Sequence, residues 1–301
     1  MVFFCYIQSM GNDVEYYQIK QSYKGCENKM KIITLVENTP GKTGCECEHG
    51  LSIYIETMKH KILLDTGASD LFLKNAKILD VDLTKVDMMV LSHGHYDHAG
   101  GLMEFVNINP SATIYMRPTA VKAYYSMKAS GAKYIGMDER IFSLPQIKYT
   151  NEREILGEQV ALFSDVSGRR FWPRGNKTLK VLENQEYRQD DFDHEQSLVI
   201  RENEKSVLIS GCAHNGILNI LDKYHEIYGS YPDMVITGFH MKSESLSEED
   251  KEVIRHTAQE LSLLKDTVFY SGHCTGEEAY NIMKQIMGEK LQALHSGEQI
   301  V

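Results

Sequence analysis

The chain has 301 residues, of which 42% are hydrophobic and 25% are charged, which is typical of a globular protein that buries a sizeable core. Its apolar runs are all shorter than the roughly 20 residues that span a bilayer, so a membrane-spanning protein is excluded. The formal net charge of −10 opposes general binding to nucleic acid or anionic membranes, because Lys and Arg carry most phosphate contacts. A small anionic molecule could still bind at a local cation.

Residues 1–29 show no clear periodicity, and they lack the basic region and the small-residue cleavage site of an export signal. We expect them to form an extension outside a core that covers 30–301. The six cysteines are spread unevenly along the chain, unlike the framework of a small secreted disulfide domain. The expected compartment is therefore a reducing cytoplasm, and no oligomeric state is indicated.

The first half of the core alternates between β-rich and helical patterns. Apolar runs predict strands over 30–38, 51–57, 61–67, 87–92 and 113–118. Helical patterns are predicted over 69–79, over a short stretch from Gly101 to Pro110, and over 119–128. The pattern weakens over about 130–193, which is rich in Gly, charge and turn formers and is interpreted as an inserted lid or long loop.

The second half repeats this alternation. Strands are predicted over 196–202, 205–210, 233–238 and 267–272, and helices over 215–227, over 248–264 and from 276 onward. Strand-rich halves that are each followed by helices indicate sheets covered by helices. The predicted fold class is therefore a layered α/β architecture.

The most distinctive stretch, LSHGHYDHAGG over 91–101, follows a predicted buried strand. It places His93, His95, Asp97 and His98 in the pattern H-x-H-x-D-H. Imidazole and carboxylate groups are ligands of zinc, iron and manganese, and close spacing at a strand end lets several of them point to one place. The two glycines that follow permit a tight backbone turn. This stretch predicts a metal site.

Other predicted strands also have potential metal ligands at or next to their ends. These residues are Asp65 in KILLDTG, His194 in DDFDHEQSL, Cys212 and His214 in LISGCAHNG, and His273 in FYSGHCTG. Each lies beside glycine or polar residues, as a ligand at a sheet edge would. We expect some of them to complete the site.

The order of these motifs resembles the metallo-β-lactamase fold superfamily over about 30–287. The motifs are, in turn, LLDTG, HGHYDH, a lone His before a strand, a turn of small residues after a strand (the elbow), and a final GH. That resemblance implies a four-layer αββα sandwich. The stretches EHGLSIYIE, GCAHNGI, ITGFH and GHCTG are more narrowly similar to the subfamily labelled 7,8-dihydropterin-6-yl-methyl-4-(β-D-ribofuranosyl)aminobenzene 5′-phosphate synthase. The label implies transfer chemistry on a phosphoribosyl compound.

The resemblance also implies two divalent metal ions, which we expect to be zinc, with iron or manganese as alternatives. His93 and His95 would bind the first ion, with His194 as a candidate third ligand. Asp97, His98 and His273 would bind the second ion. Asp65 would orient a ligand histidine and set its tautomer.

The residue that bridges the ions is an open question at this stage. Members of the superfamily often place a bridging carboxylate at the elbow, where this chain has Cys212, with His214 two residues later. A thiolate can bind zinc and could bridge two ions, whereas a neutral imidazole offers one lone pair to one ion. We favour His214 as a terminal ligand. Without a bridging side chain, hydroxide or a substrate oxygen would have to bridge.

The mechanism expected of such a centre is attack by a metal-activated water or substrate oxygen on an ester, phosphodiester or lactone. Asp97 could bind metal or accept a proton, and the sequence does not separate these roles. Residues with a candidate role in substrate binding are Glu37, Asn38, Glu48, His49, His240, Arg170 and Trp172. The alternative to a role in substrate binding is that these are ordinary polar residues at strand ends. For Arg170 and Trp172, which lie in the stretch GRRFWPR, the alternative is a solvated loop.

The leading hypothesis is thus a metal-dependent hydrolase, or hydrolase-like transferase, that acts on a small anionic substrate such as a phosphate ester or a pterin-ribosyl phosphate. One alternative is a diiron oxygen or nitric oxide reductase, but about 300 residues leave no room for a second large electron-donating domain. Another alternative is a non-catalytic metabolite sensor. A nuclease is disfavoured by the net charge and by the absence of a basic stripe.

Overall fold

The computed structural model describes residues 30–41, 44–243 and 245–301, and the predicted extension over 1–29 lies outside them. The first sheet has the strand order β1-β2-β3-β4-β5-β8. Its strands are β1 Lys31–Val36, β2 Ser52–Glu56, β3 Lys61–Leu64, β4 Met88–Val90, β5 Thr113–Met116 and β8 Ile147–Tyr149. The helices of this half are α1 Leu71–Ile78, α2 Tyr96–Ala99 and α3 Leu102–Ile108.

The second sheet has the strand order β17-β16-β15-β14-β13-β10-β9. Its strands are β9 Arg153–Ile155, β10 Val160–Phe163, β13 Ser197–Glu202, β14 Lys205–Ser210, β15 Met234–Thr237, β16 Val268–Ser271 and β17 Leu291–Ala293. The helices α4 Ile217–Tyr228, α5 Glu248–Ser262 and α6 Glu277–Met287 cover its outer face. None of the helices in the described ranges is both long enough and apolar enough to cross a membrane.

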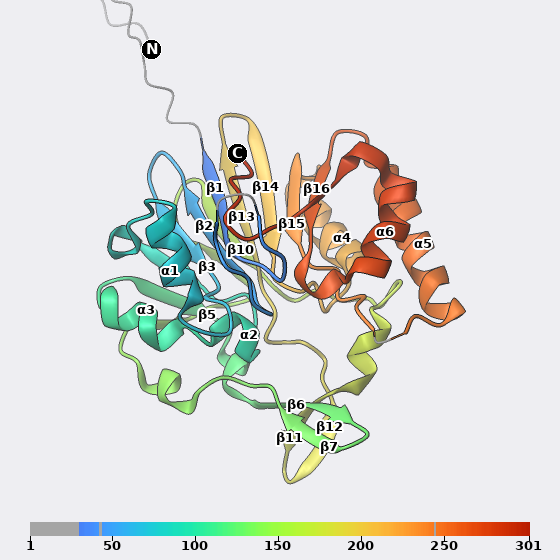
Figure 1. Cartoon of the computed structure of the whole chain (residues 1–301), viewed down its shortest axis with the longest axis horizontal. Coiled ribbons are helices and arrows are strands. Elements are labelled where there is room, and N and C mark those ends of the chain that lie inside the picture. The colour runs from blue at the N-terminus through green and yellow to red at the C-terminus, as the bar shows by residue number, and fades with distance from the viewer. Residues whose placement is uncertain (1–29, 42–43, 244) are drawn as a thin grey trace, which may run out of the picture.

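The two sheets pack face to face, and each carries helices on its other face (Figure 1). The strands are apolar on both faces. In β2, Ile53 and Ile55 point into the core between the sheets, and Tyr54 points toward the helices. In β14, Ile209 points inward and Leu208 outward. This period-two alternation between two buried faces produces the continuous apolar runs of the sequence. The predicted four-layer αββα sandwich is confirmed.

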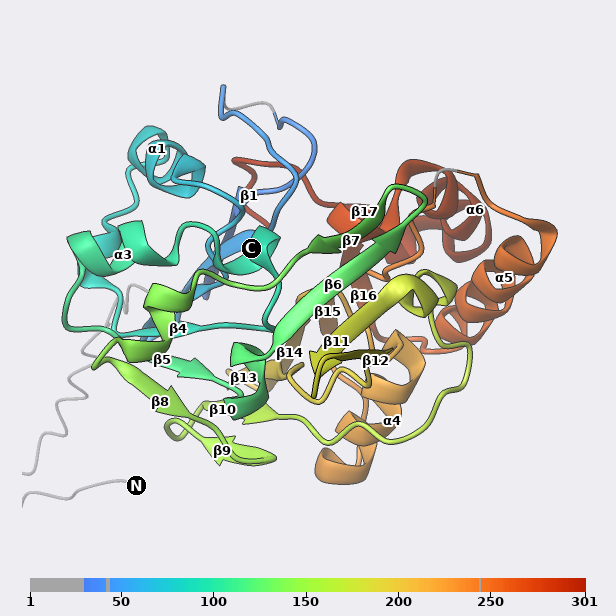
Figure 2. The ribbon, with the colours of Figure 1, turned by 90° about the horizontal axis from the view of Figure 1, so that it is seen from below.

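A third, smaller sheet lies beyond the lower edge of the sandwich and has the order β12-β11-β6-β7 (Figures 1 and 2). Its strands are β6 Ala123–Lys128, β7 Gly131–Tyr134, β11 Leu179–Glu183 and β12 Glu186–Gln189. The helix predicted over 119–128 is wrong, because only a short 3₁₀ turn, Pro118–Val121, precedes β6. Tyr124 is buried and pairs with Val181, so a partner almost 60 residues away selects the extended conformation.

The region over 130–193, interpreted from sequence as a lid or long loop, is largely built from strands. β8 extends the first sheet, β9 and β10 extend the second, and β7, β11 and β12 belong to the small sheet. The strands are short, three to five residues each, which explains why their periodicity is weak in the sequence. The small sheet buries Tyr124 in a cluster with Phe192, against which Trp172 packs.

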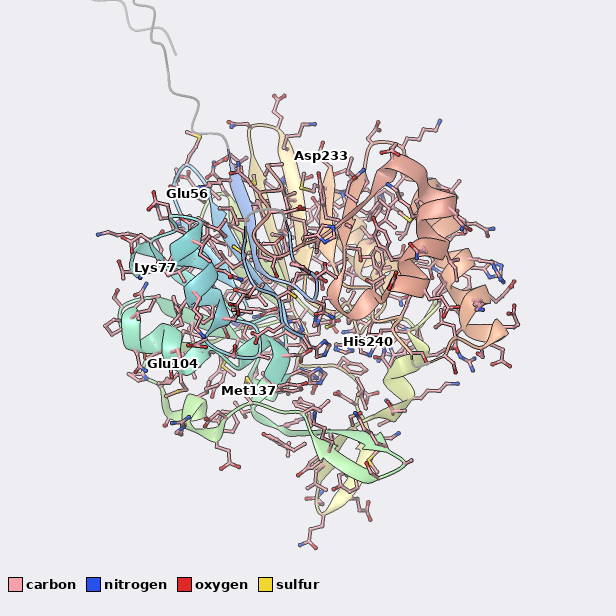
Figure 3. The ribbon with its side chains drawn as sticks, in the orientation of Figure 1. Glu56, Lys77, Glu104, Met137, Asp233 and His240 are labelled. Carbon is pink, nitrogen blue, oxygen red and sulfur yellow. The ribbon has the colours of Figure 1, made fainter. Side chains whose placement is uncertain are left out.

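In the first sheet β3, β4 and β5 run parallel to one another, and in the second sheet β14, β15 and β16 do. Non-glycine residues with left-handed backbone follow four of the strands: Asp65 after β3, Ala213 after β14, His240 after β15 and His273 after β16. Such residues are rare and cluster at functional sites. Sharp turns at these strand ends therefore direct side chains toward a common region, near His240 in Figure 3.

The core between the sheets supports a first prediction. Leu198 is fully buried there, so Leu198→Ala should lower the free energy of unfolding by about 2–5 kcal/mol. The matched control is Ile155→Ala, because Ile155 is 71% exposed and its truncation should change the stability by less than about 0.5 kcal/mol. Denaturant unfolding of both variants measures the difference. Equal stabilities would contradict the two-sheet core.

Candidate metal centre

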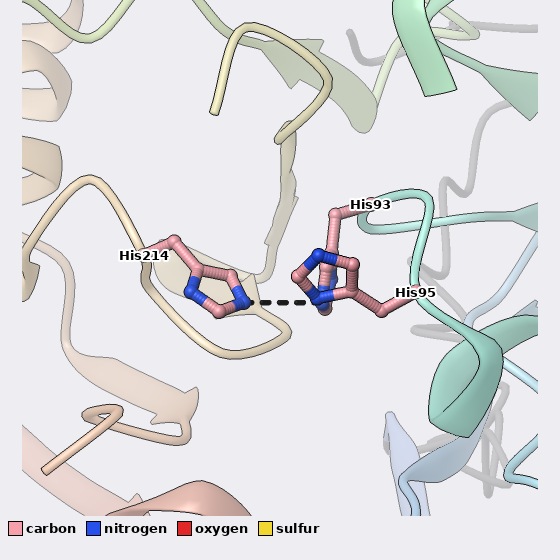
Figure 4. A group of neighbouring side chains, drawn as sticks. All are labelled: His93, His95 and His214. Carbon is pink, nitrogen blue, oxygen red and sulfur yellow. Dashed lines mark hydrogen bonds between the residues drawn. The ribbon is translucent and has the colours of Figure 1, made fainter. Parts of the chain in front are cut away.

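The centre is built from side chains that follow strands of both sheets. His93 and His95 lie in the turn between β4 and α2, and His214 lies in the elbow between β14 and α4. Figure 4 shows the first two approaching from one side and His214 from the other. All three imidazoles are at least 95% buried. The fold thus joins groups that are about 120 residues apart in the chain.

His93 and His214 face each other with nitrogens that lack protons. Nδ1 of His93 lies 2.9 Å from Oγ of Ser92, and Nδ1 of His214 lies 3.0 Å from Oδ1 of Asn176. Ser92 Oγ donates its own proton to Asp65, so it accepts from His93, and the amide oxygen of Asn176 accepts from His214. Both Nε2 atoms therefore carry bare lone pairs, yet they lie 3.3 Å apart.

Two lone pairs at that distance repel each other unless a cation lies between them. Two nitrogens on one tetrahedral zinc, each bonded at about 2.0–2.1 Å, lie roughly 3.3–3.4 Å apart. Nε2 of His95 is buried without a hydrogen-bond partner in the described chain, and it completes a group with His93 and His214 in which all donor atoms lie within 4.8 Å of one another. These three residues fit one metal position.

Burial favours the neutral imidazoles that a metal requires. It lowers the pKa of His95 to about 3 and lowers the pKa values of His93 and His214 well below their usual range, and neighbouring histidines lower them further. A neutral imidazole keeps the lone pair that a metal ion binds. The first position is therefore ready to bind metal at neutral pH without losing protons from its histidines.

A second pair of facing nitrogens belongs to His98 and His273. Nδ1 of His98 donates to Oδ2 of Asp65 at 2.6 Å, and Nδ1 of His273 donates to Oδ1 of Asn38 at 2.9 Å. Their Nε2 atoms lie 3.2 Å apart. The structure brings Asp65 to a ligand histidine, as expected from the sequence, and Asp65 also accepts from the backbone N–H of Ser92. This second pair fits a second metal position.

Asp97 lies beside the second position and at the mouth of the centre. Its Oδ2 is 3.4 Å from Nε2 of His273 and 3.9 Å from Nε2 of His98. The same oxygen lies 3.3 Å from Nε2 of the exposed His49, whose ring stacks on that of His273. Burial would raise the pKa of Asp97, but the histidines around it outweigh burial and hold the pKa well below its usual range. The carboxylate is therefore ionised.

Cys212 lies between the two positions. Its Sγ is 3.2 Å from Nε2 of His98. It also belongs to a group with His93 and His98, and to another with His214 and His240, each with all donor atoms within 4.8 Å of one another. This is the placement that a bridging ligand requires. The thiol replaces the carboxylate that the resemblance leads one to expect there.

His194, the candidate third ligand of the first ion, has both ring nitrogens engaged. Nδ1 accepts from the backbone N–H of Gly94 at 2.9 Å, so Nε2 carries the proton and donates to Asp190 at 3.1 Å. No lone pair is left for an ion. His214 takes the third place, and His194 supports the turn that carries the first histidines.

Three residues expected to contact substrate instead hold the site together. Glu37 is buried and accepts from the backbone N–H of His273 and from Thr39. Asn38 orients the ring of His273, as described above. Glu48 accepts from the backbone of Ala68 and Ser69, just before α1. The carboxylates satisfy loop N–H groups that would otherwise be unpaired.

The other substrate candidates divide into two groups. Arg170 pairs with Asp222 on α4 and Glu260 on α5, so its charge is directed to the outer helical layer rather than to the centre. His240 and Trp172 lie closer. The ring of His240 is 4.1 Å from that of His214, centroid to centroid, and Trp172 packs on Phe192, whose ring stacks on His214.

Several supporting residues were not expected from the sequence. Asn176 holds the ring of His214, Asp190 holds His194, and Glu195 accepts from the backbone N–H groups of His214 and Asn215. Glu195 follows His194 directly, so its position next to a candidate metal ligand could have indicated from the sequence that it supports the site. Asn176 and Asp190 lie in the region over 130–193 and carried no signal of their own.

The model of the family described as "Metallo-beta-lactamase superfamily" matches residues 46–273. The chain belongs to this superfamily. The 7,8-dihydropterin-6-methyl-4-(beta-D-ribofuranosyl)-aminobenzene-5'-phosphate synthase of Methanocaldococcus jannaschii is 30% identical over 293 residues, which cover 92% of this chain and 98% of that protein. The subfamily similarity expected from the sequence motifs is therefore confirmed.

Solved structures agree with the family assignment. Tm1679, described as a metal-dependent hydrolase of the β-lactamase superfamily, is 33% identical, with a TM-score of 0.76 over 91% of this chain and 99% of its own. The metallo-β-lactamase fold protein YhfI from Bacillus subtilis is 12% identical, with a TM-score of 0.54 over 91% and 100% of the two chains. The second likeness concerns the fold alone.

The contact between Asp65 and His98 supports a prediction on metal affinity. Asp65→Asn removes the charge that orients His98, so affinity at the second position should fall roughly 10–100-fold. Competition with a chromogenic chelator measures this. The control is Asp70→Asn, because Asp70 is half-exposed and its ion pair is with Lys74 on the surface. Unchanged affinity in Asp65→Asn would show that the contact does not support metal binding.

The protonation of His98 makes metal binding at this position depend on pH. Burial alone would lower its pKa, but the carboxylates of Asp65 and Asp97 raise it to about 9. His98 is therefore protonated below pH 9 and must lose a proton to bind metal, so affinity there should rise by at least about tenfold per pH unit between pH 6 and 8, and more steeply where a thiol also loses its proton. Chelator competition at several pH values tests this. A flat profile would contradict it.

Proposed function

We propose that the protein is a two-metal hydrolase, or a transferase of hydrolase-like mechanism, that acts on a small anionic substrate of the phosphate ester or pterin-ribosyl phosphate type. The observation that carries this proposal is the pair of facing, unprotonated Nε2 atoms of His93 and His214, 3.3 Å apart, beside a second facing pair, from His98 and His273, 3.2 Å apart. The synthase and hydrolase names of its relatives support both chemistries. The first pair needs a cation, the second can bind one once His98 loses its proton, and two adjacent cations suit hydrolytic or transfer chemistry.

His93, His95 and His214 would hold the first ion, and Asp97, His98 and His273 the second, with Cys212 between them. Such ions lower the pKa of a bound water toward neutrality and neutralise charge on a phosphoryl or carbonyl oxygen. We infer zinc, because imidazole together with a thiolate suits zinc better than manganese. The free thiols of the described chain are consistent with the reducing cytoplasm expected from the sequence.

The chain's own groups would orient the substrate. Asp97 lies at the mouth, ionised and held between His49 and His273, so while holding the second ion it would also accept a hydrogen bond from an attacking hydroxyl and orient it. His49 is half-exposed and lies between Asp97 and the solvent. Trp172, through Phe192, closes the side of the centre that faces the small sheet.

A cavity next to the centre supports an anionic substrate. It has a volume of about 290 Å³, begins beside His240 at Gly175 and Met241, and is lined by Lys177 and Lys242. Arg174 also lines it, but it pairs with Glu249 and with Asp250 of the same lining. The two lysines favour a phosphate group in a chain whose net charge is −10. A larger cavity, of about 940 Å³, opens instead at the amino ends of β14, β15 and β16. It is therefore remote from the proposed chemistry.

A substrate screen tests the proposed function. Zinc-loaded protein should turn over at least one member of a panel of phosphodiesters, phosphomonoesters, lactones and pterin-ribosyl phosphates. It should prefer phosphorylated compounds over matched compounds that lack the phosphate. His95→Ala should reduce turnover to the level of metal-free protein, because it removes a donor that has no other partner. Product release measured by chromatography gives the rates.

The matched control is His256→Ala, because His256 lies on α5 and its side chain is 44% exposed. It should keep full activity and metal content. Bound metal without turnover of any compound, in the wild-type protein as well, would favour a metabolite sensor over an enzyme. Less than one ion per chain after zinc loading would exclude the two-metal centre itself.

A further inference from the structure

A second buried thiol lies beside the two-metal centre. Cys274 follows His273 in the 3₁₀ turn His273–Thr275 after β16 and is 6% exposed. Its Sγ, Sγ of Cys212 and a ring nitrogen of His273 all lie within 4.8 Å of one another. Sulfur and nitrogen donors this close together can bind one ion after small side-chain adjustments.

The strand between the two thiols leaves space for them. β15 lies between β14 and β16 in the sheet, and Gly238 follows it directly. A Cβ atom at Gly238 would collide with Sγ of Cys274, so a side chain at Gly238 would push the thiol away. Cys274 Sγ donates a hydrogen bond to the carbonyl oxygen of Cys212 at 3.6 Å, a normal length for a thiol donor. Because a thiol is a weak donor, binding to a metal ion would give up little in exchange for this contact.

Charge balance also favours a second thiolate. Two divalent ions bring four positive charges into a buried region whose imidazole ligands are neutral. Asp65 and Asp97 place two negative charges next to the donor atoms. Thiolates at Cys212 and Cys274 would supply two more and make the centre neutral. Burial of charge costs least when opposite charges are paired within the same site.

We propose that Cys274 is a metal ligand and that it forms with Cys212 a pair of thiolates on the second ion, together with His273. Each thiol releases its proton to solvent as the ion binds. This proposal rests on the two-metal centre of the proposed function. It makes the second position richer in sulfur than the first, and therefore selective for zinc over manganese.

Cobalt substitution tests the proposal by a readout that is independent of activity. Cobalt(II) bound to thiolate shows a near-ultraviolet charge-transfer band whose intensity scales with the number of cobalt–sulfur bonds. With Cys212 shared by the two ions and Cys274 on the second, the wild-type band should report three cobalt–sulfur bonds, so Cys274→Ser should leave about two thirds and Cys212→Ser about one third of the intensity at equal cobalt content. Cys45→Ser is the matched control, because Cys45 is also buried and free but belongs to none of the described donor groups.

A measurement on the unaltered chain covers the case in which a variant fails to fold. In the native protein, zinc should slow the alkylation of both Cys212 and Cys274 relative to the metal-free protein, as mapped by mass spectrometry, and should leave the rates at Cys45 and Cys47 unchanged. The proposal would be overturned if folded Cys274→Ser kept the charge-transfer intensity of the wild-type protein, or if Cys274 were alkylated at the same rate with and without zinc. Either result would leave the proposed two-metal function unaffected. Failure to bind any metal would overturn both.

Discussion

The structure depends on one constraint, which is that buried imidazole nitrogens must be satisfied. The chain gives the Nδ1 atom of each paired ligand histidine an acceptor, so that the Nε2 atoms face one another. His93 faces His214 in this way, and His98 faces His273. Protein groups alone leave the first contact repulsive and the second dependent on the proton of His98, whereas a metal ion makes both contacts favourable. The polar network behind the histidines, from Asp65 to Asn176, therefore has metal binding as its physical explanation.

The sandwich makes this convergence possible because strand ends from both sheets meet at one edge. Covering both sheets with helices buries the strands on both faces and keeps them rigid. Left-handed residues such as Asp65, Ala213 and His273 then turn the chain sharply where the strands end. Buried carboxylates stabilise these turns by accepting hydrogen bonds from their backbone N–H groups. Glu195 binds the elbow of His214, and Glu37 binds the backbone of His273.

The small sheet and the region over 130–193 form the surroundings of the first metal position. They supply Asn176, Asp190 and the aromatic cluster around Phe192, all of which support that position or its neighbours. They also border the cavity that contains Lys177 and Lys242. The candidate ligands thus come from the ends of strands in the two large sheets, whereas much of the surrounding surface comes from this region.

The sequence by itself determined the layered fold and most of the donor residues, because long apolar runs and the H-x-H-x-D-H spacing are local patterns. Only the tertiary structure decided which donors meet. His194 and His214 are both candidate ligands in the sequence, with His214 favoured, but only the structure shows that the contacts of His194 with Gly94 and Asp190 use both of its nitrogens. The strand at 123–128 was likewise decided by pairing with β11. Hydrogen-bond partners and strand partners that lie far apart in the chain leave no local signal, so they become visible only when the chain is folded.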